Sequence, residues 1–239
     1  MLRITDARSG ETVEAAPVRR RLTRVEAHVP ERGTGALRVL LVADLLARTL
    51  ELGGTPVWSV LTGDADPREV QADGAALGVR PSEDSRDVGR GLGEAQIVHV
   101  IAADGGPTPD GVRVTVAPGG PVDLTGADPT VIRLALLATP RDTPVRLDPA
   151  TLDEARDTLL RWRRAVASWA ASPSRPVPES LRGRLRDAWE NDLDVPEVLR
   201  ILASVETASG GVDGARFETF AYADRLLGLD LTLALGSGT

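Results

Sequence analysis

The spacing of hydrophobic residues predicts alternating strands and helices over the first half of the chain. Apolar residues of the segment 36–52 recur at helical spacing, which indicates a helix with one buried face. Short runs rich in Val, Ile and Thr predict buried strands. The predicted strands are a hairpin within 2–15, followed by 23–29, 56–61, 95–103 and 112–116. A second helix is predicted over 67–79, and the polar stretch 80–94 leaves a further short helix open.

From residue 128 onward the pattern is helical throughout, and no strand is predicted. The predicted helices cover 129–138, 149–170, 179–190, 195–208 and 214–228, with proline-rich breaks between some of them. Strands that alternate with helices favour a parallel sheet with crossover helices. We therefore expect a Rossmann-like α/β domain over 1–127 and an all-helical bundle domain over 128–239.

Composition and charge narrow the choice of function. The net charge of −7 disfavours a nucleic acid as partner. The chain has no cysteine, which excludes disulfides and thiolate metal ligands, and all 28 of its basic residues are Arg, so no Lys can bind a phosphate. No apolar run is long enough to span a bilayer, and the N-terminus lacks the apolar segment of a signal peptide. These features predict a cytoplasmic protein that has no membrane partner.

A glycine-punctuated loop precedes the helix predicted over 36–52. Gly33, Thr34 and Gly35 stand there, where free backbone N–H groups and the helix dipole favour a bound anion such as the phosphate of a nucleotide. Neither a complete P-loop nor a complete G-x-G-x-x-G motif is present. The alternative is a tight turn in which Thr34 caps the helix, and we favour that alternative.

Four further residues are candidates for a ligand-binding crevice. His28 and His99 fall in predicted strands, and Asp64 and Asp66 follow the strand 56–61. Ligands bind at the carboxyl ends of the strands in open parallel sheets. The favoured alternatives are histidines that pack in the sheet and an Asp-rich turn that caps the next helix. Because the two histidines come from different segments and no thiolate exists, we expect no metal site and no tightly bound zinc.

Several strings carry a resemblance to a known family. Three strings stand in this order along the chain: GALRVLLVADLLARTLELGGTPVWSVLTGDADP, DPTVIRLALLATPRDTPVRLDPATLDEARDTLLRWRRAV and ENDLDVPEVLRILASV. In this order they resemble the cysteinyl-tRNA synthetase group of class I synthetases, and especially the mycothiol-pathway ligase that joins cysteine to glucosaminyl-inositol. They are similar to the stretch from its H-I-G-H motif through its T-D-x-D-D motif, the stretch after its K-M-S-K loop, and the start of its C-terminal bundle. The resemblance implies a class I synthetase type of sheet followed by helices.

The chain departs from that family at the positions that carry the chemistry. The H-I-G-H motif falls on residues 33–36 and keeps one glycine, and the K-M-S-K loop falls on 113–116, where Arg113 keeps a cation and Val116 replaces the second Lys. The family binds zinc through Cys, Cys, His and Glu, and its loop Cys matches Pro30. In the family the two His and the second Lys neutralise the phosphates during adenylation, so their loss removes charge stabilisation.

The resemblance therefore implies a truncated, motif-degenerate relative. We expect a pseudoenzyme that has no catalytic residue and acts by binding an unknown partner or small ligand. An alternative is an ATP-dependent ligase with an altered substrate, which keeps nucleotide or anion binding at Gly33, Thr34, Gly35 and Arg113. A tRNA-binding module is a further alternative, which the acidic charge disfavours.

Overall fold

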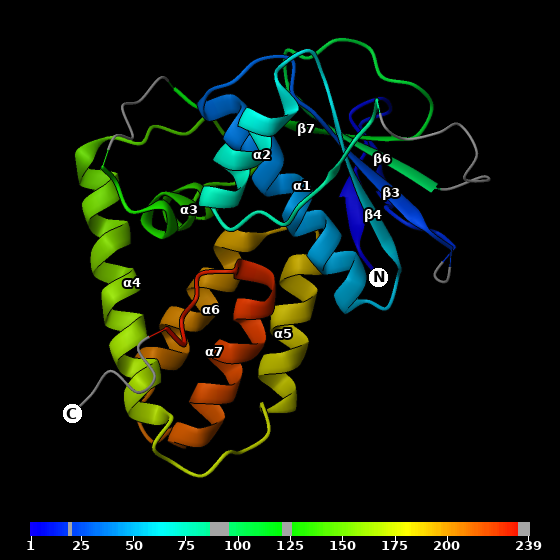
Figure 1. Cartoon of the computed structure of the whole chain (residues 1–239). Coiled ribbons are helices and arrows are strands. Elements are labelled where there is room, and N and C mark those ends of the chain that lie inside the picture. Colours follow the sequence, from blue (N-terminus) through cyan, green and yellow to red (C-terminus); the bar gives the residue numbers. More distant parts are fainter. Residues whose placement is uncertain (19–20, 87–95, 121–125, 234–239) are drawn as a thin grey trace.

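A five-stranded parallel sheet forms the centre of the first half of the protein (Figure 1). The computed structural model describes residues 1–18, 21–86, 96–120 and 126–233. The strands lie in the order β5-β4-β3-β6-β7. Their bounds are β3 Thr23–His28, β4 Val57–Thr62, β5 Glu83–Asp84, β6 Gln96–Ala102 and β7 Val112–Val116. A separate antiparallel hairpin, β1 Arg3–Thr5 and β2 Thr12–Glu14, precedes the sheet in the chain.

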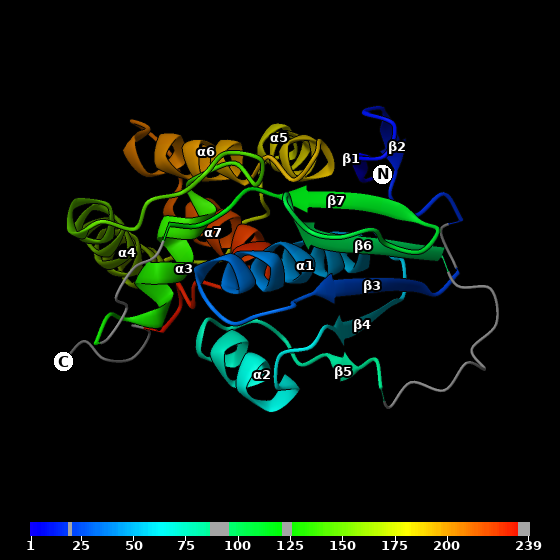
Figure 2. The ribbon, with the colours of Figure 1, turned by 90° about the horizontal axis from the view of Figure 1, so that it is seen from above.

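The two faces of the sheet have different surroundings. Helix α1 (Thr34–Leu52) lies along one face beside β3 and β6, as Figure 2 shows, and α2 (Pro67–Ala76) packs next to it. Residues that alternate along the strands toward α1 are small and apolar and fully buried, as expected for a strand covered by a helix. They are Val25, Ala27, Val98, Val100, Val114 and Val116. The opposite face carries charged and polar side chains from the same strands.

The second half consists of five helices among the described residues. They are α3 Pro129–Leu137, α4 Pro149–Trp169, α5 Glu179–Glu190, α6 Val195–Thr207 and α7 Asp213–Leu227. Helices α3, α4 and α6 begin in the same way, with an Asp as the cap and a Pro within the first two positions of the helix. The first backbone N–H groups of a helix have no partner within it. The Asp carboxylate accepts a hydrogen bond from one of these groups, and the Pro has no N–H. Trp162 and Trp169 both pack edge-on against Phe220 in the bundle core.

The predicted fold class is confirmed, because a parallel α/β sheet is followed by helices, and no strand lies beyond residue 128 in the described ranges. Two local features differ from the expectations. Residues 83–84 of the stretch 80–94 pair with β4 as a short strand, and residues 87–94, where a short helix was left open, lie outside the described residues. Gly33, with φ of 139°, caps α1 in place of Thr34, which is the first residue of that helix.

The two halves share one hydrophobic core. A single cluster of buried residues runs from the sheet through α1 into α3, α4 and α7. The change from alternating to purely helical structure falls near residue 128, while the division into two domains at 127 and 128 stays a prediction. In the described part of the chain, no helix is long and apolar enough to cross a membrane.

Candidate functional site

The order of the strands creates a switch point in the sheet. The chain leaves β3 toward β4 on one side and later returns to pair β6 with β3 on the other side. In open α/β sheets a crevice forms where the order reverses in this way, at the carboxyl ends of the two strands, and ligands bind there. The crevice between β3 and β6 is therefore the first place to look for a site.

Three side chains with metal-binding or proton-binding atoms converge on one face of these two strands. Glu26 pairs in register with His99 across β3 and β6, and His28 lies two residues further along β3, on the same face. His28 Nε2 lies 2.9 Å from His99 Nδ1, and Glu26 Oε2 lies 2.9 Å from that Nδ1 and 3.6 Å from His28 Nε2. The side chains of His99 and Glu26 are 0% and 10% exposed, and that of His28 is 21% exposed. We call these residues the His-Glu cluster.

Neighbouring groups hold the His-Glu cluster in place. His99 Nε2 lies 3.2 Å from the carbonyl oxygen of Asp110, in the loop between β6 and β7. That loop reaches the ring because Gly111 has φ of 137° and no side chain. A Cβ atom there would lie 2.7 Å from the Ile97 carbonyl oxygen and 3.3 Å from His99 Nε2. Arg24 Nε lies 2.8 Å from the outer carboxylate oxygen of Glu26, Oε1, so Oε2 faces the two imidazoles.

The surroundings of the carboxylate in the His-Glu cluster favour its ionised form. Burial alone would raise the pKa of Glu26, but contacts with His28 and His99 and the charge of Arg24 together hold that pKa well below its usual value. The cluster thus places a carboxylate beside two imidazoles, which is an arrangement that can hold a proton or a metal cation.

The sequence identified two members of the cluster and missed the third. His28 and His99 were crevice candidates, yet nothing in their own segments showed that they would touch. Glu26 was not singled out. The signal for it was the spacing Glu-x-His in a predicted strand, because residues two apart on a strand point to the same face.

The candidates for anion binding are not brought together. Gly33 caps α1, and Thr34 and Gly35 are its first two residues. The side chain of Thr34 packs closely against Gly119, where an added Cβ atom would lie 2.6 Å from it. Arg113 lies on the face of β7 that points away from α1, since the alternate residues of that strand are the ones buried beneath the helix. Its guanidinium donates to the Gly105 carbonyl oxygen at 3.0 Å.

The two aspartates after β4 lie in an exposed turn. Asp66 is the cap of α2 and its carboxylate accepts a hydrogen bond from the backbone N–H of Arg68 at 2.9 Å. Asp64 is exposed in the same turn. Asp66 therefore has the capping role that the sequence favoured, and neither residue belongs to the His-Glu cluster as the structure describes it.

The thiolate zinc site of the resembling family does not fit this chain. Two of the four ligands in that set are cysteines, and the chain has none. The position that matches the family's loop Cys holds Pro30, which has no side-chain donor. No step of chemistry can therefore be assigned to such a zinc here.

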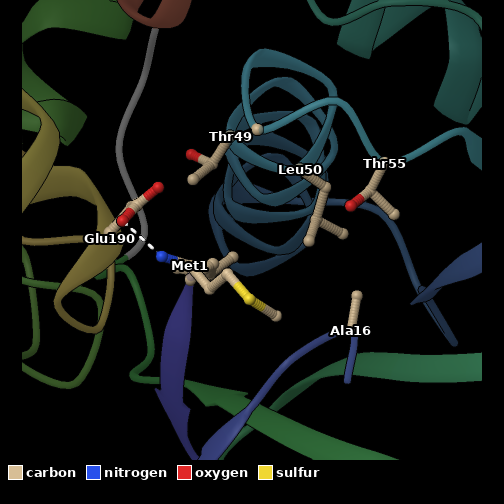
Figure 3. A pocket seen from close by; sticks show the side chains of 8 residues that line it. Met1, Ala16, Thr49, Leu50, Thr55 and Glu190 are labelled. Atoms are coloured by element: carbon tan, nitrogen blue, oxygen red, sulfur yellow. Dashed lines mark hydrogen bonds and ion pairs between the residues drawn. The ribbon is translucent and has the colours of Figure 1, made fainter. Parts of the chain in front are cut away.

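A hollow at the far end of α1 is too small for a substrate. Figure 3 shows Thr49 and Leu50 from the last turns of α1 beside Met1 and Ala16, with the Met1 amino group directed toward Glu190 of α5 at 2.5 Å. Its volume is about 20 Å³. A space of this size holds about one water molecule, so we do not regard it as a ligand site.

Several known proteins that the chain resembles are ligases. The chain is 38% identical over 106 residues to the L-cysteine:1D-myo-inositol 2-amino-2-deoxy-alpha-D-glucopyranoside ligase of Acidothermus cellulolyticus. The matched region covers 44% of this chain and 25% of that ligase. The ligase of the same name from Segniliparus rotundus is 39% identical over 111 residues, 45% of this chain and 26% of the relative. That of Streptomyces coelicolor is 34% identical over 131 residues, 51% of this chain and 31% of the relative.

The resemblance is partial on both sides. It covers about half of this chain, and the matched part corresponds to between a quarter and a third of the relatives' length. No protein-family model matches the chain.

Proposed function

We propose that this chain, a relative of the mycothiol-pathway cysteine ligases over about half of its length, does not adenylate cysteine and acts by binding a small ligand or a partner at the crevice of its sheet. The start of α1 supports the absence of adenylation. Residues 33–36, which match the H-I-G-H motif, carry neither an imidazole nor a cation. Backbone N–H groups alone remain there to meet a phosphate.

The position of Arg113 is the observation that carries this proposal. Arg113 is the one cation kept from the K-M-S-K loop, and it lies on the opposite face of the sheet from α1, bonded to the Gly105 carbonyl oxygen. Val116, at the position of the second Lys, is 1% exposed within the core. Loss of one preorganised charge-stabilising group typically slows a reaction by about a hundred- to a thousand-fold, and here the two His and the second Lys are replaced.

A second candidate function is an ATP-dependent ligase with a different substrate. The observation in its favour is that the relatives named above are ligases. Such an enzyme would bind ATP at the start of α1 and activate another acid. A tRNA-binding module is a weaker candidate, since the net charge is −7.

Three measurements separate these functions. The first is cysteine-dependent ATP–pyrophosphate exchange, run beside the Acidothermus cellulolyticus ligase as positive control. We expect no exchange above the blank for this chain, with cysteine or with any other amino acid. The second is an ATP titration by calorimetry, in which we expect weak binding or none. Exchange with any amino acid would contradict the proposal and identify the substrate, and a mobility shift of tRNA at physiological salt would favour the tRNA-binding module.

A further inference from the structure

The separations within the His-Glu cluster match those of atoms that share one metal ion. Two ligand atoms bonded to a zinc-like ion at about 2.1 Å lie about 3.0 Å apart at a right angle and about 3.4 Å apart at the tetrahedral angle. The three separations among Glu26 Oε2, His28 Nε2 and His99 Nδ1 are 2.9, 2.9 and 3.6 Å. One ion placed between the three atoms therefore reaches all of them with small shifts of the side chains.

The contacts of His99 require a proton or a metal ion at this point. A backbone carbonyl oxygen only accepts, so the contact with the Asp110 carbonyl oxygen places a hydrogen on His99 Nε2. In the neutral ring the lone pair is then on Nδ1. Oε2 of Glu26 faces that Nδ1 at 2.9 Å, and a carboxylate oxygen also accepts. Two lone pairs this close inside the protein repel each other unless a proton or a metal ion lies between them.

The surroundings of the cluster are those of a metal site. Histidines that bind metals usually donate the other ring N–H to a carbonyl or carboxylate, and carboxylates that bind metals are themselves held by other groups. His99 meets the first condition through Asp110, and Glu26 meets the second through Arg24 at Oε1. Gly111 permits the loop to approach the ring. These contacts fix the orientation of the ligand atoms before any ion arrives.

From these observations we propose that Glu26, His28 and His99 bind one divalent transition-metal ion of the zinc type at the switch point of the sheet. Two imidazoles and one carboxylate suit zinc, cobalt or nickel better than magnesium or calcium, which prefer oxygen ligands. Three protein ligands leave a position for water or an incoming ligand. The site contains no cysteine, so it differs from the thiolate site of the resembling family, and it does not depend on the proposed function. It replaces the expectation of no metal site, which assumed that histidines from different segments would lie apart.

Two nearby cations weigh against metal binding, and their positions limit the effect. Arg24 pairs with Oε1 of Glu26 and leaves Oε2 directed at the imidazoles. Arg113 stands beside His99 in the register of β6 and β7, but its guanidinium donates to Gly105 in the adjoining loop. The preference for zinc over magnesium comes from the two imidazole ligands, because hard, strongly hydrated cations gain least from them.

The test uses the full chain without a histidine tag, in the absence of ATP and cysteine. Zinc is titrated by calorimetry, and cobalt by visible absorption. We expect one equivalent of either ion. The chain has only two histidines, so the imidazole nitrogens of ¹⁵N-labelled protein give signals from His28 and His99 alone. Both histidines should show a shifted ring nitrogen when zinc is added, which assigns the ligands in the unmodified protein.

Variants then test each ligand. Glu26→Gln and His28→Gln should each lower zinc affinity by more than the roughly 10- to 100-fold that loss of a supporting group costs. Gly111→Ala, which displaces the supporting loop, should lower it within that range. The matched control is Asp66→Asn, which makes the same carboxylate-to-amide change in a nearby exposed turn and should leave zinc affinity unchanged.

The proposal is overturned by any of three results. The first is the absence of stoichiometric binding of both zinc and cobalt to the unmodified chain, which would make the cluster a proton-bridged packing feature. The second is binding that leaves both imidazole signals in place. The third is binding that survives in Glu26→Gln and His28→Gln, each of which is first shown to be folded by its thermal transition. Since no nucleotide is present, these results are independent of the test for adenylation.

Discussion

Asp44 of α1 and Arg133 of α3 form an ion pair in which both side chains are 1% exposed, with Oδ2 and Nη2 3.0 Å apart. Arg133 also donates to the carbonyl oxygens of Leu77 and Leu227, and Asp44 accepts from Arg48 and Arg80. One buried carboxylate thus joins the α/β half to the helical half, because its partners come from both.

Asp44→Asn should be strongly destabilising. The amide keeps the volume of the side chain but removes the charge that compensates the buried guanidinium of Arg133. Loss of one partner of a buried ion pair typically costs about 3–5 kcal/mol, because the other charge remains in the interior. Urea unfolding followed by circular dichroism measures the change in the free energy of unfolding.

The control for this change is Asp73→Asn. Asp73 pairs with the half-exposed Arg32 on the surface, and exposed pairs contribute about 1 kcal/mol or less. An equal loss of stability in the two variants would mean that burial does not set the strength of the Asp44 interaction.

Acid should destabilise the protein through two buried carboxylates. Burial opposes the ionisation of both groups. The charges of Arg133 and Arg48 nevertheless hold the pKa of Asp44 below its usual 3.8. Contacts with His28 and His99 hold the pKa of Glu26 below its usual 4.5. A folded pKa below the unfolded one gives stability that is complete above the unfolded pKa and is lost as the pH falls through the folded pKa.

Above about pH 5.5 these two groups should therefore not make the free energy of unfolding depend on pH. Below about pH 4.5 the free energy of unfolding, measured with urea, should fall steadily as the pH falls. Glu26→Gln should reduce the steepness of the fall, because the amide does not titrate. A slope that is the same in this variant and in the unmodified chain would show that Glu26 has an ordinary pKa in the folded protein.

Gly63→Ala should disrupt the loop that leaves the end of β4. Gly63 has φ of 149°, and a Cβ there would lie 1.9 Å from the Val29 carbonyl oxygen, which is backbone and cannot move aside. We expect a loss of well over 1 kcal/mol, measured by urea unfolding. Gly35→Ala is the matched control, because a Cβ at Gly35 meets nothing within 4 Å and lies in a helix, where Ala is favoured. A neutral Gly63→Ala would show that the loop can adopt a different path.

Arg38→Met should loosen the junction between the sheet and the helical half. Arg38 is 2% exposed and donates to the carbonyl oxygens of Ala117, Pro140 and Thr143 at 2.7 to 2.8 Å. Methionine fills much of the space but donates no hydrogen bond, and each buried acceptor left unpaired costs about 1–3 kcal/mol. We expect a loss of at least about 3 kcal/mol in urea, against little change for Arg68→Met at an exposed position. Retention of stability in Arg38→Met would mean that water reaches these carbonyls.

The sequence by itself was sufficient for most of the secondary structure and for the fold class. The helices over 149–170 and 195–208 were located within a residue or so, because helical periodicity depends on side chains three and four positions apart and a cap is formed by neighbours in the chain. Four of the strands of the parallel sheet were found from short runs rich in Val, Ile and Thr, whereas β5 was not predicted. The order of the strands in the sheet was not predicted, because it depends on contacts between segments that lie far apart in the chain.

Only the tertiary structure decided which residues meet. His28 and His99 are 71 positions apart, and Asp44 and Arg133 are 89 positions apart. The contact between the histidines depends on the register of β3 against β6, and a shift of that register by one residue would turn His99 to the other face. The same alternation places Arg113 away from α1. Local sequence determines which element forms, whereas pairing over long distances depends on how the whole core packs, and no single segment contains that information.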